Sequence, residues 1–121
     1  MKTKPLTFWD SIPKDIETQA VAEEGDLITS IGGVAFLIQR RNDYNNIVCK
    51  RYKKSKMTFQ RVIWHYVNFL RENKIQYIRV EGNERRYNFF LKLAPKMNIC
   101  CIKDIAESEE LHRNVFYLKI Y

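Results

Sequence analysis

The stretch that decides the fold runs IVCKRYKKSKMTFQRVIWHYVNFLRENKIQYIRVEGNERRYNFFLKLA, from Ile47 to Ala94. Within it, Ile47–Tyr52 and Ile75–Glu81 are rich in β-branched and aromatic residues, which favours strands. The segment between them starts at Thr58, a residue type that caps helices, and its pattern predicts a helix to about Asn73. Because a helix joins the two strands, we expect them to lie parallel in one sheet.

Two amphipathic helices are predicted from the apolar spacing of this stretch. The first carries a stripe with the 3.6-residue period of a helix that packs on a sheet, made of Val62, Ile63, Tyr66, Val67 and Leu70. The second is predicted over Glu84–Ala94, after a turn at Gly82-Asn83, and its core-facing side chains are expected to be Tyr87, Phe90, Leu91 and Ala94. Pro95 is expected to end it, because proline lacks the N–H that a helix interior uses.

The residues before this stretch predict a hairpin. Asp26–Ser30 and Val34–Arg40 are apolar runs on either side of Ile31-Gly32-Gly33, whose glycines suit a turn with positive φ. The run Val34–Ile38 is almost continuously apolar, so we expect both faces of that strand to be buried. Ile47–Tyr52 then returns as the third strand of a meander.

The two ends of the chain complete the order of elements. Residues 1–12 are expected to form an arm, extended or as a brief strand, and a helix is predicted over residues 11–25. Asn98–Ile105 and Val115–Tyr121 are predicted strands, with an acidic loop, Ala106–Asn114, between them. The order is helix, three-strand meander, helix, strand, helix and two C-terminal strands, which predicts an α/β domain with a mixed sheet.

Length and charge indicate a single domain with an affinity for anions. At 121 residues, 45% of them apolar and 29% charged, the chain is long enough for one core but not for two, so residues 1–121 are treated as one domain. A formal net charge of +7 favours nucleic acid, a nucleotide cofactor or an acidic protein face as partner. The same charge also fits a basic surface that only meets solvent.

The cysteines and the hydropathy predict a cytoplasmic protein with no membrane partner. Cys49, Cys100 and Cys101 are an odd number without metal or redox spacing, so structural thiols of a reducing compartment are expected. His65 and His112 lack ligand-spaced partners, and no metal site is expected. No apolar run is long enough to cross a bilayer, and the N-terminus lacks the apolar core of a signal peptide.

Lys53–Pro95 resembles the second half of the GNAT superfamily of acyl-CoA-dependent N-acetyltransferases, and the element order over residues 25–121 is similar too. The family carries Asn-x-x-Ala-x-x-Phe-Tyr-x-Lys-x-Gly-Phe on the helix after its central strand. The matching residues are Asn83, Phe89 and Lys92. Arg86 stands where a small alanine is usual, and Phe90 stands where the family often keeps a tyrosine that protonates the leaving thiolate.

The same resemblance implies a pyrophosphate-binding loop before the long helix. The family pattern Arg/Gln-x-x-Gly-x-Gly/Ala aligns with Lys53-Lys54-Ser55-Lys56-Met57-Thr58, so Lys56 and Thr58 occupy the glycine positions. Glycine there lets backbone N–H groups approach the pyrophosphate, whereas lysines would hold phosphate by charge. The cofactor-binding residues implied are Lys53, Lys54, Ser55, Lys56, Thr58 and Asn83. We expect no cofactor, or acetyl-CoA if the chain is an enzyme.

Glu81 and Tyr87 are the candidate catalytic residues. Glu81 ends the central strand and could act as a general base if burial raised its pKa, or it could be a surface acid paired with Arg79 or Arg85. Tyr87 lies one helical turn from Phe90 and could replace the missing acid, or it could simply pack in the core.

The sequence leaves three functions open. The first is a GNAT-fold structural or interaction module with protein partners, similar to small phage-encoded members of the fold, in the host cytoplasm or a virion. Its contact surfaces would include the basic turn Lys50–Lys56 and the acidic loop Ala106–Asn114. The second is an N-acetyltransferase, and the third is a nucleic-acid-binding domain that uses Lys50–Lys56. We favour the first, because two chemical positions of the family are altered.

Overall fold

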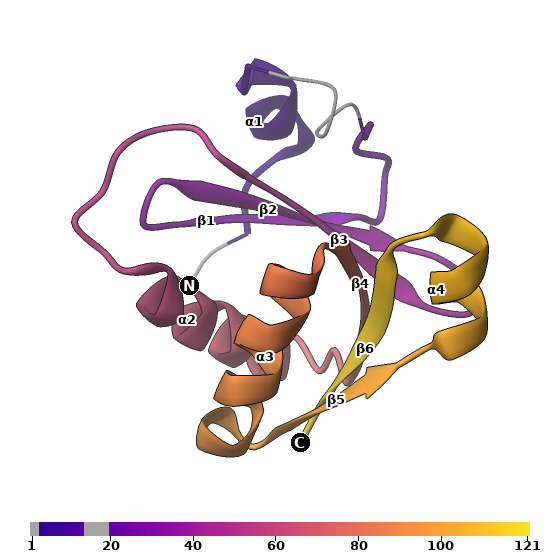
Figure 1. Cartoon of the computed structure of the whole chain (residues 1–121). Coiled ribbons are helices and arrows are strands. Elements are labelled where there is room, and N and C mark those ends of the chain that lie inside the picture. Colours follow the sequence, from indigo (N-terminus) through magenta and orange to yellow (C-terminus); the bar gives the residue numbers. More distant parts are fainter. Residues whose placement is uncertain (1–2, 14–19) are drawn as a thin grey trace. The chain divides into compact units, whose positions relative to one another are not determined.

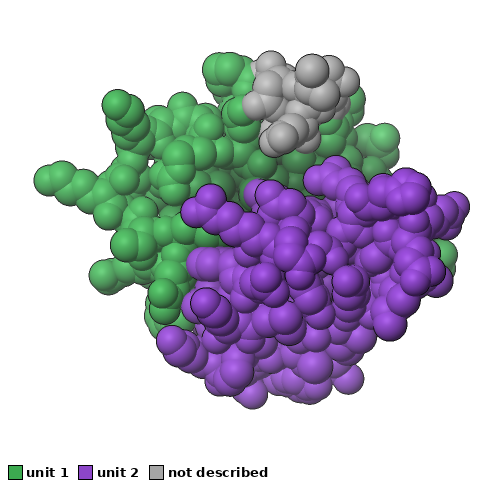
Figure 2. Space-filling model, in the orientation of Figure 1, with its two compact units in different colours: residues 1–66 green, residues 67–121 purple. Residues whose placement is uncertain are grey.

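The computed structural model describes residues 3–13 and 20–121, and the chain divides into two compact units, residues 1–66 and 67–121 (Figure 2). Unit 1 and unit 2 each combine three strands with helices (Figure 1). The predicted α/β class is therefore confirmed.

An antiparallel meander forms the frame of unit 1. Its strands are β1 (Leu27–Ile31), β2 (Val34–Arg40) and β3 (Asn45–Arg51), paired in that order. The predicted hairpin and the returning third strand are confirmed. β3 begins earlier than expected, because Asn45 pairs with Arg40 at the far end of β2.

β2 is buried on both faces, as predicted. On one face, Ala35 and Leu37 of β2 form a cluster with Trp9, Ile12 and Ile28. On the other face, the Phe36 ring stacks on Tyr66 of α2 (Phe59–Glu72), with the ring centroids 4.1 Å apart. The hydroxyl oxygen of Thr58 accepts the N–H of Arg61 at 3.2 Å, which confirms the predicted helix cap, and the predicted apolar stripe of α2 is buried.

The N-terminal segment differs from the prediction of an arm. It contains a short helix, α1 (Leu6–Ser11), because Trp9 turns inward and its indole N–H donates to the carbonyl of Ala20 at 2.8 Å. The helix predicted over residues 11–25 is absent from 20–25, where Gly25 adopts a φ of +94° in a turn. Residues 14–19 of that predicted helix lie outside the described residues.

Unit 2 is built around the C-terminal strand. Its complete elements are β4 (Tyr77–Gly82), α3 (Glu84–Met97), β5 (Ile99–Lys103), α4 (Ile105–Leu111) and β6 (Asn114–Ile120). β6 pairs antiparallel with both β4 and β5. The Phe116 ring of β6 faces α3, where the centroids of Tyr87 and Phe90 lie 5.2 and 5.6 Å away.

Pro95 does not end α3, contrary to the prediction. The helix continues to Met97 and ends at Asn98, whose left-handed backbone lets its N–H reach the carbonyl of Ala94. Proline removes a single helical hydrogen bond there, while the buried Met97 keeps the last turn on the core. The buried face also differs from the prediction: Leu91 is 41% exposed and Leu93 only 4%.

The predicted acidic loop is also wrong, because most of it forms α4. The carboxylate of Asp104 accepts the N–H of Glu107 at 3.0 Å and caps the helix. The spacing Asp-x-x-Glu is the capping-box pattern, so this helix start was present in the sequence as a signal. β5 consequently ends at Lys103, earlier than predicted.

Candidate functional site

The basic loop, defined as residues 50–56, leaves β3 and makes a wide arc before α2 (Figure 1). Its cations are Lys50, Arg51, Lys53, Lys54 and Lys56. Within the described ranges, no acidic side chain forms an ion pair with Lys53, Lys54 or Lys56. All three are exposed, so this part of the loop presents uncompensated positive charge.

The start of the basic loop is fixed to the β1–β2 turn. The carbonyl of Gly33 accepts the N–H of Tyr52 at 2.9 Å and that of Lys53 at 3.4 Å. The Tyr52 hydroxyl lies 2.5 Å from the hydroxyl of Ser30, and its ring meets the edge of Phe8. The Lys53 ammonium lies 5.8 Å from the centroid of the Tyr52 ring. These contacts hold the first loop residues on the body of unit 1.

Hydroxyl groups in the loop and at the start of α2 accept backbone N–H groups next to the predicted cofactor-binding residues. Ser55 Oγ accepts the N–H of Met57 at 3.2 Å, and Thr58 Oγ1 accepts the N–H of Arg61 at the same distance. Ser55 and Thr58, both predicted to bind the cofactor, therefore stabilise the loop and the helix start. Of the other predicted ligands, Lys53, Lys54 and Lys56 are exposed and offer only side-chain charge.

Charge is unevenly distributed along unit 1. Asp26 lies at the end of the hairpin remote from the basic loop, where its carboxylate accepts the N–H of Arg40 and lies 3.9 Å from the guanidinium of Arg41. Asp43 sits in the β2–β3 turn at the same end. The seven residues of β2 separate the two ends by about 20 Å at a strand rise of about 3.3 Å per residue. Asp26 and Asp43 thus lie at the end of the meander away from Lys53, Lys54 and Lys56.

The two candidate catalytic residues lie on opposite faces of the unit 2 strands. Glu81 points to the same side as Arg79, whose guanidinium is 3.4 Å from its carboxylate. Tyr87 packs on the other side, against Phe116. Asn83 caps α3, with its side-chain oxygen accepting the N–H of Arg86 at 2.9 Å. The structure therefore does not bring Glu81 and Tyr87 together as an acid–base pair.

The surroundings of Tyr87 also disfavour its role as a proton donor. Burial, together with Cys101 and Glu84, raises the pKa of the Tyr87 hydroxyl. The ammonium of Lys103 lies 5.4 Å from the centroid of its ring. Tyr87 thus joins the packing of α3 on the strands, and its phenol is a weaker acid than an exposed tyrosine.

Arg79 forms a buried charge cluster with two carboxylates. The pair with Glu81 was one of the alternatives that the sequence left open and is confirmed, whereas the pair with Glu107 was missed. The side chain of Arg79 is 8% exposed and donates to the carboxylate of Glu107 at 2.5 Å, besides meeting Glu81. Burial alone would lower the pKa of Arg79, but the Glu107 hydrogen bond and the charges of both carboxylates raise it. Glu107 lies 28 residues further along the chain, on a segment predicted as loop, so only a capping-box prediction of α4 would have indicated the pair.

A surface hollow of about 510 Å³ lies in unit 2 between α3 and α4. Its walls carry both signs of charge, from Lys103, His112 and Arg113 and from Glu84 and Glu109. Ser108 is a buried polar residue of its wall, and that hydroxyl already accepts the N–H of Val115 and donates to the carbonyl of Asp104. The hollow therefore offers mixed surface charge without a buried polar group aimed at a ligand.

Comparisons with protein-family models, with curated proteins and with solved structures find no match. Across residues 3–13 and 20–121, no helix has both the length and the apolar character needed to cross a membrane. The same residues contain no group of three His, Cys, Asp or Glu side chains placed to hold a metal ion. Cys49, Cys100 and Cys101 form no disulfide and are half-buried.

Proposed function

We propose that this chain is an interaction module built on the element order of the GNAT superfamily, and that the basic loop binds an acidic protein partner in an assembly, such as a virus particle. The observation that carries the proposal is the uncompensated charge of Lys53, Lys54 and Lys56 on a loop anchored at Gly33. Exposed cations that are not paired with an acid of the same chain are available to an external acidic group.

Two features favour surface recognition over acyl transfer. Ser55 and Thr58 bind N–H groups of their own chain, so a pyrophosphate would compete with existing hydrogen bonds. Glu81 and Tyr87 face opposite sides of the strands, so neither residue is placed to complete a proton relay with the other. An N-acetyltransferase with acetyl-CoA as cofactor remains the alternative that the experiment below must exclude.

A nucleic acid is the second candidate partner, because phosphates also complement a cluster of lysines. The two partners differ in how binding responds to salt. Binding to nucleic acid weakens steeply with salt, with a slope set by the number of phosphates neutralised. An acidic protein face has fewer and more widely spaced charges, so we expect a shallower slope.

The test measures binding of three probes to the full chain. Fluorescence anisotropy follows a labelled peptide rich in Glu and Asp and a labelled single-stranded oligonucleotide, and calorimetry follows acetyl-CoA. The double variant Lys53→Glu, Lys54→Glu lowers the charge of the loop from +5 to +1. The double variant Lys92→Glu, Lys96→Glu changes the net charge equally on exposed positions of α3 and serves as the matched control.

We expect the acidic peptide to bind the wild-type chain and the α3 control, and to lose at least tenfold in affinity with the loop variant, a change of about 1.4 kcal/mol. Equal loss in both variants would show that only net charge matters and would refute a specific contact surface. Tighter binding of the oligonucleotide, with a steep salt slope, would replace the acidic protein by nucleic acid. Saturable binding of acetyl-CoA would favour the enzyme.

A further inference from the structure

The unit 2 strands have one face packed on α3 and one face that is largely open. Side chains on the open face alternate with the core side chains along each strand. In the register of the strands, Tyr77 lies opposite Lys119, Ile102 opposite Tyr117, and Cys100 also opposite Lys119. We call this set the tyrosine face: Tyr77, Cys100, Ile102, Tyr117 and Lys119.

Large apolar groups on the tyrosine face meet solvent. Tyr77 is 39% exposed and Ile102 is 43% exposed. The rings of Tyr77 and Tyr117 stack with their centroids 5.1 Å apart, so the two side chains form one aromatic cluster. Next to it, Tyr121 is 60% exposed and carries the ammonium of Lys119 at 5.4 Å from its ring centroid. Clustered exposed aromatic residues are typical of protein–protein interfaces.

α4 covers only one end of this side of the strands. Ser108 of α4 binds the backbone of Val115, and Glu107 reaches Arg79. At that end, two carboxylates, of Glu81 and Glu107, share one guanidinium, and about a third of each carboxylate side chain is exposed. The covered end therefore carries a net charge of −1 from these three groups.

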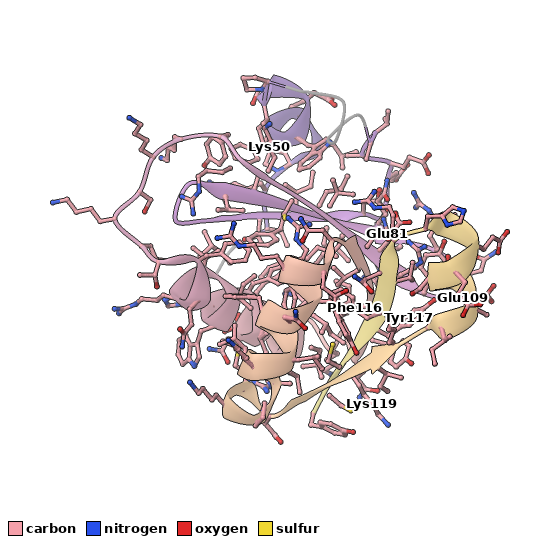
Figure 3. The ribbon with its side chains drawn as sticks, viewed as in Figure 1. Lys50, Glu81, Glu109, Phe116, Tyr117 and Lys119 are labelled. Atoms are coloured by element: carbon pink, nitrogen blue, oxygen red, sulfur yellow. The ribbon has the colours of Figure 1, made fainter. Side chains whose placement is uncertain are left out.

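The other end of the tyrosine face is positive. Figure 3 shows Lys119 and Glu81 toward opposite ends of the strands, with Tyr117 between them. Val115, which pairs with Glu81, precedes Lys119 by four residues, or about 13 Å at the rise of a strand. Along the strands, the surface is therefore positive at Lys119, aromatic at Tyr117 and negative at Glu81.

Such a polarity makes the surface complementary to itself. A two-fold axis that lies between two copies and runs across the strands brings the tyrosine faces together with their strand directions reversed. Lys119 of each copy then lies over the Glu81 and Glu107 end of the other, while the aromatic centres meet in the middle. Isologous contacts of this kind are the commonest route to a closed dimer.

We propose that the chain forms a two-fold homodimer through the tyrosine face, with Lys119 of one copy against the Glu81 and Glu107 carboxylates of the other. The dimer is independent of the basic loop, which belongs to unit 1. A dimer would carry two basic loops and so could double the valency of an assembly contact.

Sedimentation equilibrium of the full chain over a range from low micromolar to several hundred micromolar tests this proposal. The wild-type chain is expected to reach twice its monomer mass. Lys119→Glu places like charges at both ends of the interface, and Ile102→Lys places a cation in its apolar centre, so each should weaken the dimer at least tenfold. Lys92→Glu matches the charge change of Lys119→Glu on exposed α3 and should leave the dimer intact.

Alkylation of Cys100 provides a second readout that does not depend on a variant. Cys100 belongs to the tyrosine face, so its reaction with iodoacetamide should slow as the chain concentration rises. Cys49 of unit 1 serves as the internal reference in the same mass spectrum.

The outcomes separate the possible occupants of the face. A monomer at every concentration, or a dimer unaffected by Lys119→Glu and Ile102→Lys, would overturn the proposal. A monomer that binds a single-stranded oligonucleotide and loses it in Lys119→Glu would make the face a base-stacking surface and would also overturn it. A dimer that is weakened by Lys119→Glu and Ile102→Lys would support the proposal even if the loop variant bound the acidic peptide as well as the wild-type chain does.

Discussion

Replacement of Gly33 by alanine should destabilise unit 1 and displace the start of the basic loop. Gly33 has a φ of +75°, a region that residues with a Cβ rarely adopt. A Cβ built there would lie 2.3 Å from the carbonyl oxygen of Lys53. Because both atoms belong to backbone segments in contact, no side-chain rotation relieves the clash. The carbonyl of Gly33 also accepts the N–H groups that fix Tyr52 and Lys53.

The expected loss follows from two separate contributions. Left-handed backbone costs a residue with a Cβ about 1–2 kcal/mol. Displacement of packed neighbours costs about 1–3 kcal/mol more, as in other overpacked sites. Gly33→Ala should therefore lower the free energy of unfolding by about 2–5 kcal/mol in total. Gly25→Ala isolates the first contribution, because Gly25 has a φ of +94° and nothing within 4 Å of its added Cβ.

Urea unfolding followed by circular dichroism compares the two variants with the wild-type chain. Gly25→Ala should lose about 1–2 kcal/mol, so the difference between the variants measures the clash alone. Anisotropy with the acidic peptide then tests whether Gly33→Ala weakens binding more than Gly25→Ala does at equal folded fraction. Equal losses of stability in the two variants would refute the idea that the contact with Lys53 determines the turn.

Three further outcomes test the description of unit 2. Burial, aided by Cys100, raises the pKa of Cys101 from 9.0 to about 11. At pH 8 the alkylation of Cys101 should therefore be on the order of 100-fold slower in the folded than in the urea-unfolded chain. Because the pKa is higher in the folded state, the contribution of this thiol to stability should be complete below about pH 9 and should disappear as the pH rises through about 11. Glu107→Ala should lower the unfolding free energy by about 2–3 kcal/mol and Glu81→Ala by about 1 kcal/mol. Glu107 makes the shorter contact with Arg79, so its removal leaves the buried guanidinium less well compensated than removal of Glu81 does. Equal losses would contradict this order. Ser108→Ala should cost about 1–3 kcal/mol in the same assay, because a buried strand N–H loses its acceptor, and a neutral result would contradict the role of this hydroxyl.

Patterns of burial over many residues were predictable from the sequence. β2 could be recognised as buried on both faces because its apolar run is continuous, and α2 because its stripe keeps one helical period. α1 could not be predicted, because it depends on Trp9 inserting its ring against Ile28 and Leu37, which are distant in sequence. A short helix of this kind is stabilised by tertiary packing more than by its own residues.

Competition between local signals explains the errors near α3. Pro95 gives a strong stop signal, yet a proline near the end of a helix removes one hydrogen bond while Leu93 and Met97 remain packed below it. The sequence predicted Leu91 in the core, whereas the structure buries Leu93. The predicted and observed buried faces of α3 thus differ by a rotation of part of a turn about the helix axis. Such a rotation changes little in the apolar spacing and is settled only by what the helix packs against.

The sequence could nominate candidate site residues one by one but not how they are arranged. Parity along β4 determines the face that Glu81 occupies, and Arg79, two residues earlier, shares that face and binds the carboxylate. Tyr87 lies beyond the turn, on the helix that covers the opposite face. Moving Glu81 to the side of Tyr87 would require a one-residue slip of β4, and that slip would also carry Arg79 into the core with α3. The same parity that keeps the two residues apart leaves Tyr77 and Tyr117 together on the open side, so the register that separates Glu81 from Tyr87 also produces the exposed aromatic cluster that we propose as a dimer interface.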